Sequence, residues 1–145
     1  MDHRSVARDL LSLLCAIQGM ATMAIDLNRT HATNPKWPSH ARFHLVWQVM
    51  TVAILSTVEV ALIWWRGPFE EQRFYVTLSL ASVPCVAFLL ALLSQRIYGG
   101  SLSEPNGIPR GRIVIFGKVF HGDLNLAAVV AASLSLAAIY EIYQC

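Results

Sequence analysis

Four of the five histidines in this 145-residue chain fall in, or at the edge of, two polar segments that separate apolar stretches. Two aspartates adjoin the same segments. Imidazole and carboxylate groups are common ligands of iron and zinc, and they are also common general acids and bases in enzymes. We therefore expect the reactive groups to be His31, His40, His44, His121, Asp26 and Asp123.

The spacing of two of these histidines is informative. If a helix begins by Ser39, the side chains of His40 and His44 project from one face, with their Cβ atoms about 5–6 Å apart. Two imidazoles in that arrangement can share one metal ion. Gln48 continues the same stripe, and Glu59 falls below it, deep in an apolar stretch. A charged carboxylate facing lipid there costs about 2.5 kcal/mol or more, so we expect Glu59 to be protonated or paired, and include it among the catalytic candidates.

Other polar residues near the two segments could contact a substrate. We expect this role for Asn34, Trp37, Arg42, Gln48 and Asn125. Asn, Asp and Ser at such positions also cap helices, and Asp123 and Ser39 are placed to do so. A purely structural role therefore stays open for each of these residues.

The apolar stretches that carry these groups are long enough to cross a membrane. The chain is 55% hydrophobic but only 14% charged, whereas soluble proteins are about 25% charged. The stretches cover residues 10–27, 43–65, 74–93 and 124–143. About 20 apolar residues in a helix span the hydrocarbon core, and open sheets cannot do so. The sequence therefore predicts an all-α bundle of four transmembrane helices, forming a single membrane domain over residues 1–145.

The connections between these stretches predict an orientation. The two long ones, residues 28–42 and 95–123, lie on the same side of the membrane if there are four crossings. They contain seven Lys or Arg residues, against four on the opposite side. The positive-inside rule then places the long connections in the cytoplasm. The apolar, β-branched segment at residues 113–116 is expected to lie on the membrane surface or to enter the mouth of the bundle.

Several functions find no support in the sequence. There is no run of Lys or Arg, no G-x-x-x-x-G-K and no G-x-G-x-x-G, so nucleic acid and nucleotides are not expected partners. The three cysteines form no C-x-x-C pair, which argues against a disulfide framework or a thiolate zinc site.

The segment from Asn34 to His44 has the pattern N-P-x-W-P-x-H-A-R-F-H. Together with His121-Gly122-Asp123, it resembles a family of small, functionally uncharacterised four-helix membrane proteins of bacteria and fungi. This resemblance covers nearly the whole chain and implies the same fold, but it implies no particular reaction.

The pattern of residues favours a small membrane-embedded enzyme that acts on a lipophilic molecule such as a sterol, a terpene or a quinone. Two mechanisms stay open: acid/base isomerisation or cyclisation by His–Asp pairs, and chemistry assisted by one iron or zinc ion held by His31, His40, His44 and His121. The alternative is a non-catalytic membrane protein, either a carrier of small molecules or metal ions or a subunit of an assembly. The expected partners are membrane lipids or lipophilic molecules, and a homo-oligomer could supply further helices.

Overall fold

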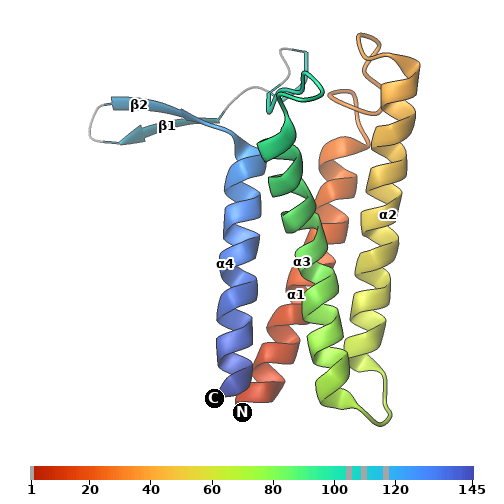
Figure 1. Ribbon diagram of the computed structural model, residues 1–145, viewed down its shortest axis with the longest axis vertical. Coiled ribbons are helices and arrows are strands. Elements are labelled where there is room, and N and C mark those ends of the chain that lie inside the picture. The colour runs from red at the N-terminus through yellow and green to blue at the C-terminus, as the bar shows by residue number, and fades with distance from the viewer. Residues whose placement is uncertain (1, 104–105, 109–110, 116–117) are drawn as a thin grey trace.

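A computed structural model describes residues 2–103, 106–108, 111–115 and 118–145 as a bundle of four helices (Figure 1). The helices are α1 (His3–Asp26), α2 (Ser39–Trp64), α3 (Glu70–Ser94) and α4 (Leu124–Gln144). Each is long and apolar enough to cross a membrane. The predicted all-α bundle is thus confirmed, and the chain is a multi-pass membrane protein by the length and composition of its helices.

Three helices begin earlier than the apolar pattern indicates. α1 begins at His3 rather than Leu10, and α2 and α3 begin at Ser39 and Glu70, four residues before their apolar stretches. Hydropathy identifies only the apolar part of a helix, so it does not detect a polar first turn. Pro38, in an extended conformation, occupies the cap position before α2, so Ser39 is the first residue of the helix and not its expected cap.

The closest packing joins α1 to α2. Residues at four-residue intervals in α1 form the buried stripe Ala7, Leu11, Cys15 and Gly19. Gly19 lies against Ser56 of α2, and the Ser56 hydroxyl donates a hydrogen bond of 2.5 Å to the Cys15 carbonyl oxygen. Small residues permit such close approach of helix backbones, which is how helices associate in lipid without a hydrophobic driving force.

α3 and α4 are joined chiefly at the end of the bundle that holds the termini. The rings of Phe74 and Tyr143 stack with their centroids 3.7 Å apart, and the Gln144 amide donates to the Tyr75 hydroxyl at 2.8 Å. The buried residues of α4 are Leu136, Ile139 and Tyr143. All three lie in the second half of the helix, so its first half is the less enclosed part.

A two-stranded hairpin leaves the bundle sideways from the start of α4 (Figure 1). Its strands are β1 (Gly111–Ile115) and β2 (Lys118–Gly122), paired antiparallel with Arg112 opposite His121. Residues 113–115 of the segment expected at the membrane surface thus belong to β1. Residue 116 of that segment lies outside the described residues. A Cβ atom on Gly111 would lie 2.8 Å from the Leu124 side chain, so the base of the hairpin rests directly on α4.

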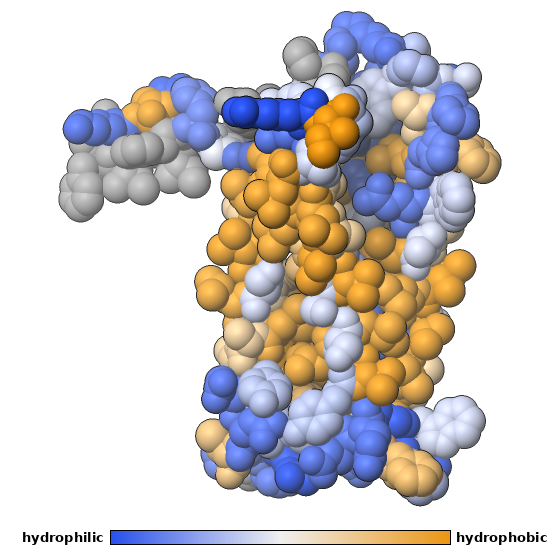
Figure 2. Space-filling view, in the orientation of Figure 1, coloured by the Kyte–Doolittle hydropathy of each residue, from blue (hydrophilic) through white to orange (hydrophobic). Residues whose placement is uncertain are grey.

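The surface divides into three zones along the bundle. Figure 2 shows a broad apolar band around its middle, with hydrophilic side chains at both ends. The two termini lie at one end, and the two long connections lie at the other (Figure 1). We call these the terminal end and the loop end.

Candidate functional site

His31 lies at the loop end, just after α1, and its imidazole is held in a defined orientation. The amide nitrogen of Asn28 donates to the Ala24 and Ile25 carbonyl oxygens at 3.0 and 2.8 Å, which leaves its oxygen as an acceptor. The Thr30 hydroxyl donates its single proton to that oxygen at 2.7 Å. The same hydroxyl oxygen lies 2.7 Å from Nδ1 of His31, which donates to it in the tautomer that carries its proton on Nδ1.

A carboxylate faces the same nitrogen. Oδ1 of Asp26, at the end of α1, lies 3.8 Å from Nδ1 of His31. Both side chains are largely shielded, with exposed fractions of 14% for His31 and 23% for Asp26. With Nδ1 protonated, Nε2 carries the lone pair and is the basic nitrogen of the ring. Asp26 is placed to stabilise the imidazolium that forms when Nε2 takes a proton.

Trp37 carries a buried donor beside this group, and Arg42, on the first turn of α2, carries another buried donor. The Trp37 ring contacts the His31 ring edge-on, with the centroids 5.0 Å apart. Nε1 of Trp37 and Nε of Arg42 are both buried and have no acceptor among the described residues. Buried N–H groups are nearly always satisfied, so the unsatisfied Nε1 of Trp37 beside the His31 ring marks a place where an oxygen atom from outside the chain would be stabilised.

Asn34 connects the two long loops. Its side chain is 5% exposed, and its amide nitrogen donates to the Asn106 carbonyl oxygen at 2.7 Å and to the Thr30 carbonyl oxygen at 3.0 Å. Its amide oxygen accepts from the Lys36 backbone at 3.0 Å. The bond to Asn106 therefore holds the loop that carries His31 against the second loop, and the bonds to Thr30 and Lys36 fix the conformation of the first loop itself.

His40 and His44 form a second, separate pair on the first turns of α2. Helix α2 begins at Ser39, as their spacing requires, and the two Nε2 atoms lie 3.1 Å apart. The rings meet edge-on with their centroids 4.5 Å apart. Both residues are exposed, as is Gln48 one turn further along.

Within the part of the chain that the structure describes, only two of the histidines, His40 and His44, contact each other. His31 pairs with Asp26, and His40 pairs with His44. His121 lies on β2, which leaves the bundle on the side of α4, while α2 forms the opposite side (Figure 1). Among the described residues, no three His, Cys, Asp or Glu side chains converge in a way that would hold a metal ion.

Asp123 and Asn125 lie at the start of α4. Oδ1 of Asp123 accepts from the backbone N–H groups of Asn125 and Leu126, at 2.9 and 3.1 Å, so its carboxylate caps the helix. The Asn125 side chain lines a cavity of about 200 Å³ between α3, the loop that follows it and α4. Gln95 and Tyr98 supply further polar groups to this cavity.

Glu59 lies inside the bundle, on the face of α2 that packs against α1. Its side chain is 2% exposed, and Oε1 has no hydrogen-bond partner among the described residues. No Lys, Arg or His side chain described here pairs with it. The Thr77 hydroxyl of α3 is also buried and has no partner within the described chain. Glu59 is therefore a buried carboxyl group remote in sequence and height from the loop-end histidines.

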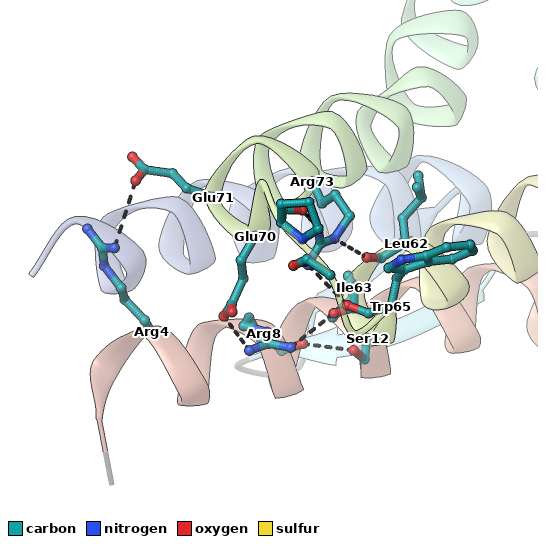
Figure 3. A network of polar contacts seen from close by, with 11 residues as sticks. Arg4, Arg8, Ser12, Leu62, Ile63, Trp65, Glu70, Glu71 and Arg73 are labelled. Carbon is teal, nitrogen blue, oxygen red and sulfur yellow. Dashed lines mark hydrogen bonds and ion pairs between the residues drawn. The ribbon is translucent and has the colours of Figure 1, made fainter.

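The terminal end carries a polar network that was not among the expected functional residues (Figure 3). Nη1 of Arg8 pairs with a Glu70 oxygen at 2.5 Å, and Nη2 donates to the Ile63 carbonyl oxygen at 3.0 Å. The guanidinium also lies over the Trp64 ring, 5.6 Å from its centroid. Arg8 therefore joins α1 to the end of α2 and the start of α3.

Arg73 closes the turn between α2 and α3 in the same network. Its guanidinium donates to four backbone carbonyl oxygens: those of Leu62, Trp65, Gly67 and Pro68. Phe69, between these acceptors and α3, has a φ of 66°, a conformation uncommon outside glycine. The sequence does contain a pattern that could have predicted this network. Two arginines precede the first apolar stretch and two glutamates precede the third, so opposite charges meet at one end of the bundle.

Comparison of the chain with protein-family models, with curated proteins and with solved structures finds no match. The resemblance noted from the motif between Asn34 and His44 stays a prediction.

Proposed function

We propose that the chain is a small membrane enzyme that moves a proton on a lipophilic molecule, with His31 as the acid and base and Asp26 as its partner. The observation that carries this proposal is the bond between Nδ1 of His31 and the Thr30 hydroxyl. With that hydroxyl donating to Asn28, His31 adopts the tautomer that has its proton on Nδ1 and a basic Nε2.

The reaction follows from this arrangement. Nε2 takes a proton from a carbon or oxygen atom of the substrate, and the resulting imidazolium is stabilised by the Asp26 carboxylate. Returning the proton at another position of the same molecule completes an isomerisation. A cyclisation would instead begin from the imidazolium form, in which Nε2 gives its proton to a double bond and then takes a proton back from the cyclised cation. Neither reaction changes the number of electrons, so no redox partner is required.

The unsatisfied donors support a substrate that carries an oxygen atom. Nε1 of Trp37, beside His31, would bind a hydroxyl or carbonyl oxygen and would stabilise negative charge that develops on it when the proton leaves. Nε of Arg42 is a second buried donor without an acceptor among the described residues. The site lies at the membrane end of α1 and α2, where an amphiphilic molecule presents its polar group. Sterols, polyprenyl alcohols and quinones all have this form.

Exchange of hydrogen for deuterium tests the proposal without knowledge of the product. The purified protein would be incubated in D₂O with liposomes that contain a sterol, a polyprenyl alcohol or a quinone, and the extracted lipids would be analysed by mass spectrometry. We expect deuterium in one of these classes. Substitution His31→Ala should slow labelling by about 100-fold or more, the usual contribution of a general acid or base.

Matched variants separate catalysis from folding. His3→Ala changes an exposed histidine at the terminal end and should leave labelling unchanged. Added imidazole should partly restore labelling by His31→Ala, and Asp26→Asn should slow labelling without loss of the folded protein. Absence of deuterium in all three lipid classes, or equal labelling by His31→Ala, would count against the enzyme and favour a non-catalytic membrane protein.

Metal-assisted chemistry is a second candidate, favoured by the pair on α2. Zinc-bound imidazole nitrogens lie about 2.0–2.1 Å from the ion, which puts two such nitrogens about 3.3 Å apart in a tetrahedral site. The Nε2 atoms of His40 and His44 lie 3.1 Å apart, close to that separation. Both side chains are exposed, so water, substrate or a second copy of the chain could supply the remaining ligands.

A further inference from the structure

A shallow groove of about 320 Å³ opens between α3 and α4. Its apolar walls come from Leu78, Leu136 and Ala137, and its polar lining includes Ser82, Tyr140 and Glu141. In Figure 2, pale, weakly hydrophilic atoms interrupt the apolar band on the face formed by these two helices. The groove exists because α3 and α4 are clamped together by Phe74 and Tyr143 at the terminal end and are less closely packed above that point.

The groove has one charged end and one apolar end. Glu141 lies three residues before the end of α4, which places it about 4.5 Å along the axis from that end. Leu136 lies about 12 Å from the same end, within the apolar band. An occupant that follows the groove therefore has a polar head near the membrane surface and an apolar chain directed toward the middle of the bilayer.

The carboxylate of Glu141 favours a cation at the polar end. It is exposed and forms no ion pair with any described Lys, Arg or His residue. It also lies in the last turn of α4, where the helix dipole disfavours negative charge, and no basic residue offsets it in that turn. Tyr140, whose side chain is 41% exposed, lines the groove beside it and offers an aromatic face to a cation.

We propose that this groove binds a bilayer phospholipid with an ammonium headgroup, with one acyl chain along Leu78, Leu136 and Ala137 and the ammonium group at Glu141 and Tyr140. Charge complementarity selects the headgroup. The groove, about 320 Å³ in volume and apolar along Leu78, Leu136 and Ala137, has room for one acyl chain. The site is separate from the loop-end histidines and does not depend on the activity proposed for them.

Native mass spectrometry of the full chain tests this proposal. The protein would be released from nanodiscs made of equal amounts of phosphatidylethanolamine and phosphatidylglycerol with identical acyl chains. We expect about fivefold more bound phosphatidylethanolamine, the effect of one charge contact near the membrane surface. Glu141→Gln should remove this preference. Asp9→Asn, which removes an exposed carboxylate of α1 that does not line the groove, should keep it.

A second variant tests the groove itself. Ala137→Phe fills the space between Leu78 and Leu136 and should lower the amount of both lipids bound. Equal binding of the two lipids by the wild type, or an unchanged preference in Glu141→Gln, would overturn the proposal. A dimer that is lost in Ala137→Phe would also overturn it, because the groove would then be occupied by a second copy of the chain.

Discussion

Gly19 of α1 and Ser56 of α2 approach so closely that a Cβ atom on Gly19 would lie 2.7 Å from the Ser56 hydroxyl oxygen and 2.8 Å from its Cβ atom. The Ser56 hydroxyl meanwhile donates to the Cys15 carbonyl oxygen one turn earlier in α1. This contact sets the distance between α1, whose end leads to His31, and α2, which carries His40 and His44.

Enlarging Gly19 should therefore separate α1 from α2. We expect Gly19→Ala to lower the free energy of unfolding by about 1–3 kcal/mol, the usual cost of overpacking. The measurement is unfolding in mixed detergent micelles. In the double variant Gly19→Ala with Ser56→Gly, the added methyl group finds space, so part of the loss should be recovered. If the double variant is as unstable as the sum of the two single changes, the close approach is not the cause.

Removal of the Arg8 side chain should loosen the terminal end. Arg8→Ala loses the contacts with Glu70, Ile63 and Trp64, and we expect it to cost about 1–2 kcal/mol. Arg4→Ala is the matched control, because the pair of Arg4 and Glu71 is 3.9 Å long and more than half exposed. It should cost less than about 0.5 kcal/mol. Similar unfolding curves for the two variants would show that the Arg8 network contributes little.

Replacement of Glu59 distinguishes its charge from its volume. A carboxyl group with 2% exposure and no cationic partner among the described residues is most stable in its neutral form, which Gln imitates in size and polarity. We expect Glu59→Gln to fold with a stability within about 1 kcal/mol of the wild type. Glu59→Ala leaves a cavity and should lose about 2 kcal/mol or more. Failure of Glu59→Gln to fold would show that the carboxyl group itself holds the helices together.

Metal analysis tests the pair formed by His40 and His44. If these residues hold iron or zinc, protein purified without chelators should contain about one equivalent, and His40→Ala and His44→Ala should each lose it. His121→Ala separates two arrangements. A site built on the α2 pair keeps its metal in this variant, whereas a cluster of all four histidines loses it. Metal-free wild-type protein would argue for acid/base chemistry at His31.

The orientation in the membrane is open to a direct test with native cysteines. Cys15 and Cys85 are buried, whereas Cys145 is exposed at the terminal end. With the long loops in the cytoplasm, a membrane-impermeant maleimide added to intact cells should label Cys145. A variant that combines Cys145→Ser with Thr33→Cys moves the only exposed thiol to the loop end and should be protected. The reverse result would invert the predicted orientation.

The four helices could be predicted from the sequence because hydrocarbon imposes one simple requirement on each. A run of about 20 apolar residues has no other stable form in lipid. The starts of the helices were less predictable, since their first turns hold polar residues that hydropathy does not assign to a membrane helix, among them Arg8 and Glu70, which pair with each other. The hairpin was not predicted, because the apolar β-branched segment from Ile113 onward suits a strand and an interfacial segment equally well.

The site was predictable in its parts but not in its assembly. The four-residue spacing of His40 and His44 was enough to predict their contact, because both lie on one helix. The distance of His121 from them depends on the direction of the hairpin, which is fixed by the contact of Gly111 with Leu124. The bond between His31 and Thr30 depends on how Asn28 ends α1, which is a matter of local geometry and not of spacing.

The uneven burial of α4 has a mechanical consequence. Its three buried residues lie in its second half, and the hairpin extends from its first residue. A sideways force on the hairpin therefore acts at the end of a long arm, with the stacked rings of Phe74 and Tyr143 as the pivot. Pulling on the hairpin would tilt the first half of α4 before it separated the aromatic pair. The loop end of α4 would therefore be displaced before its terminal end.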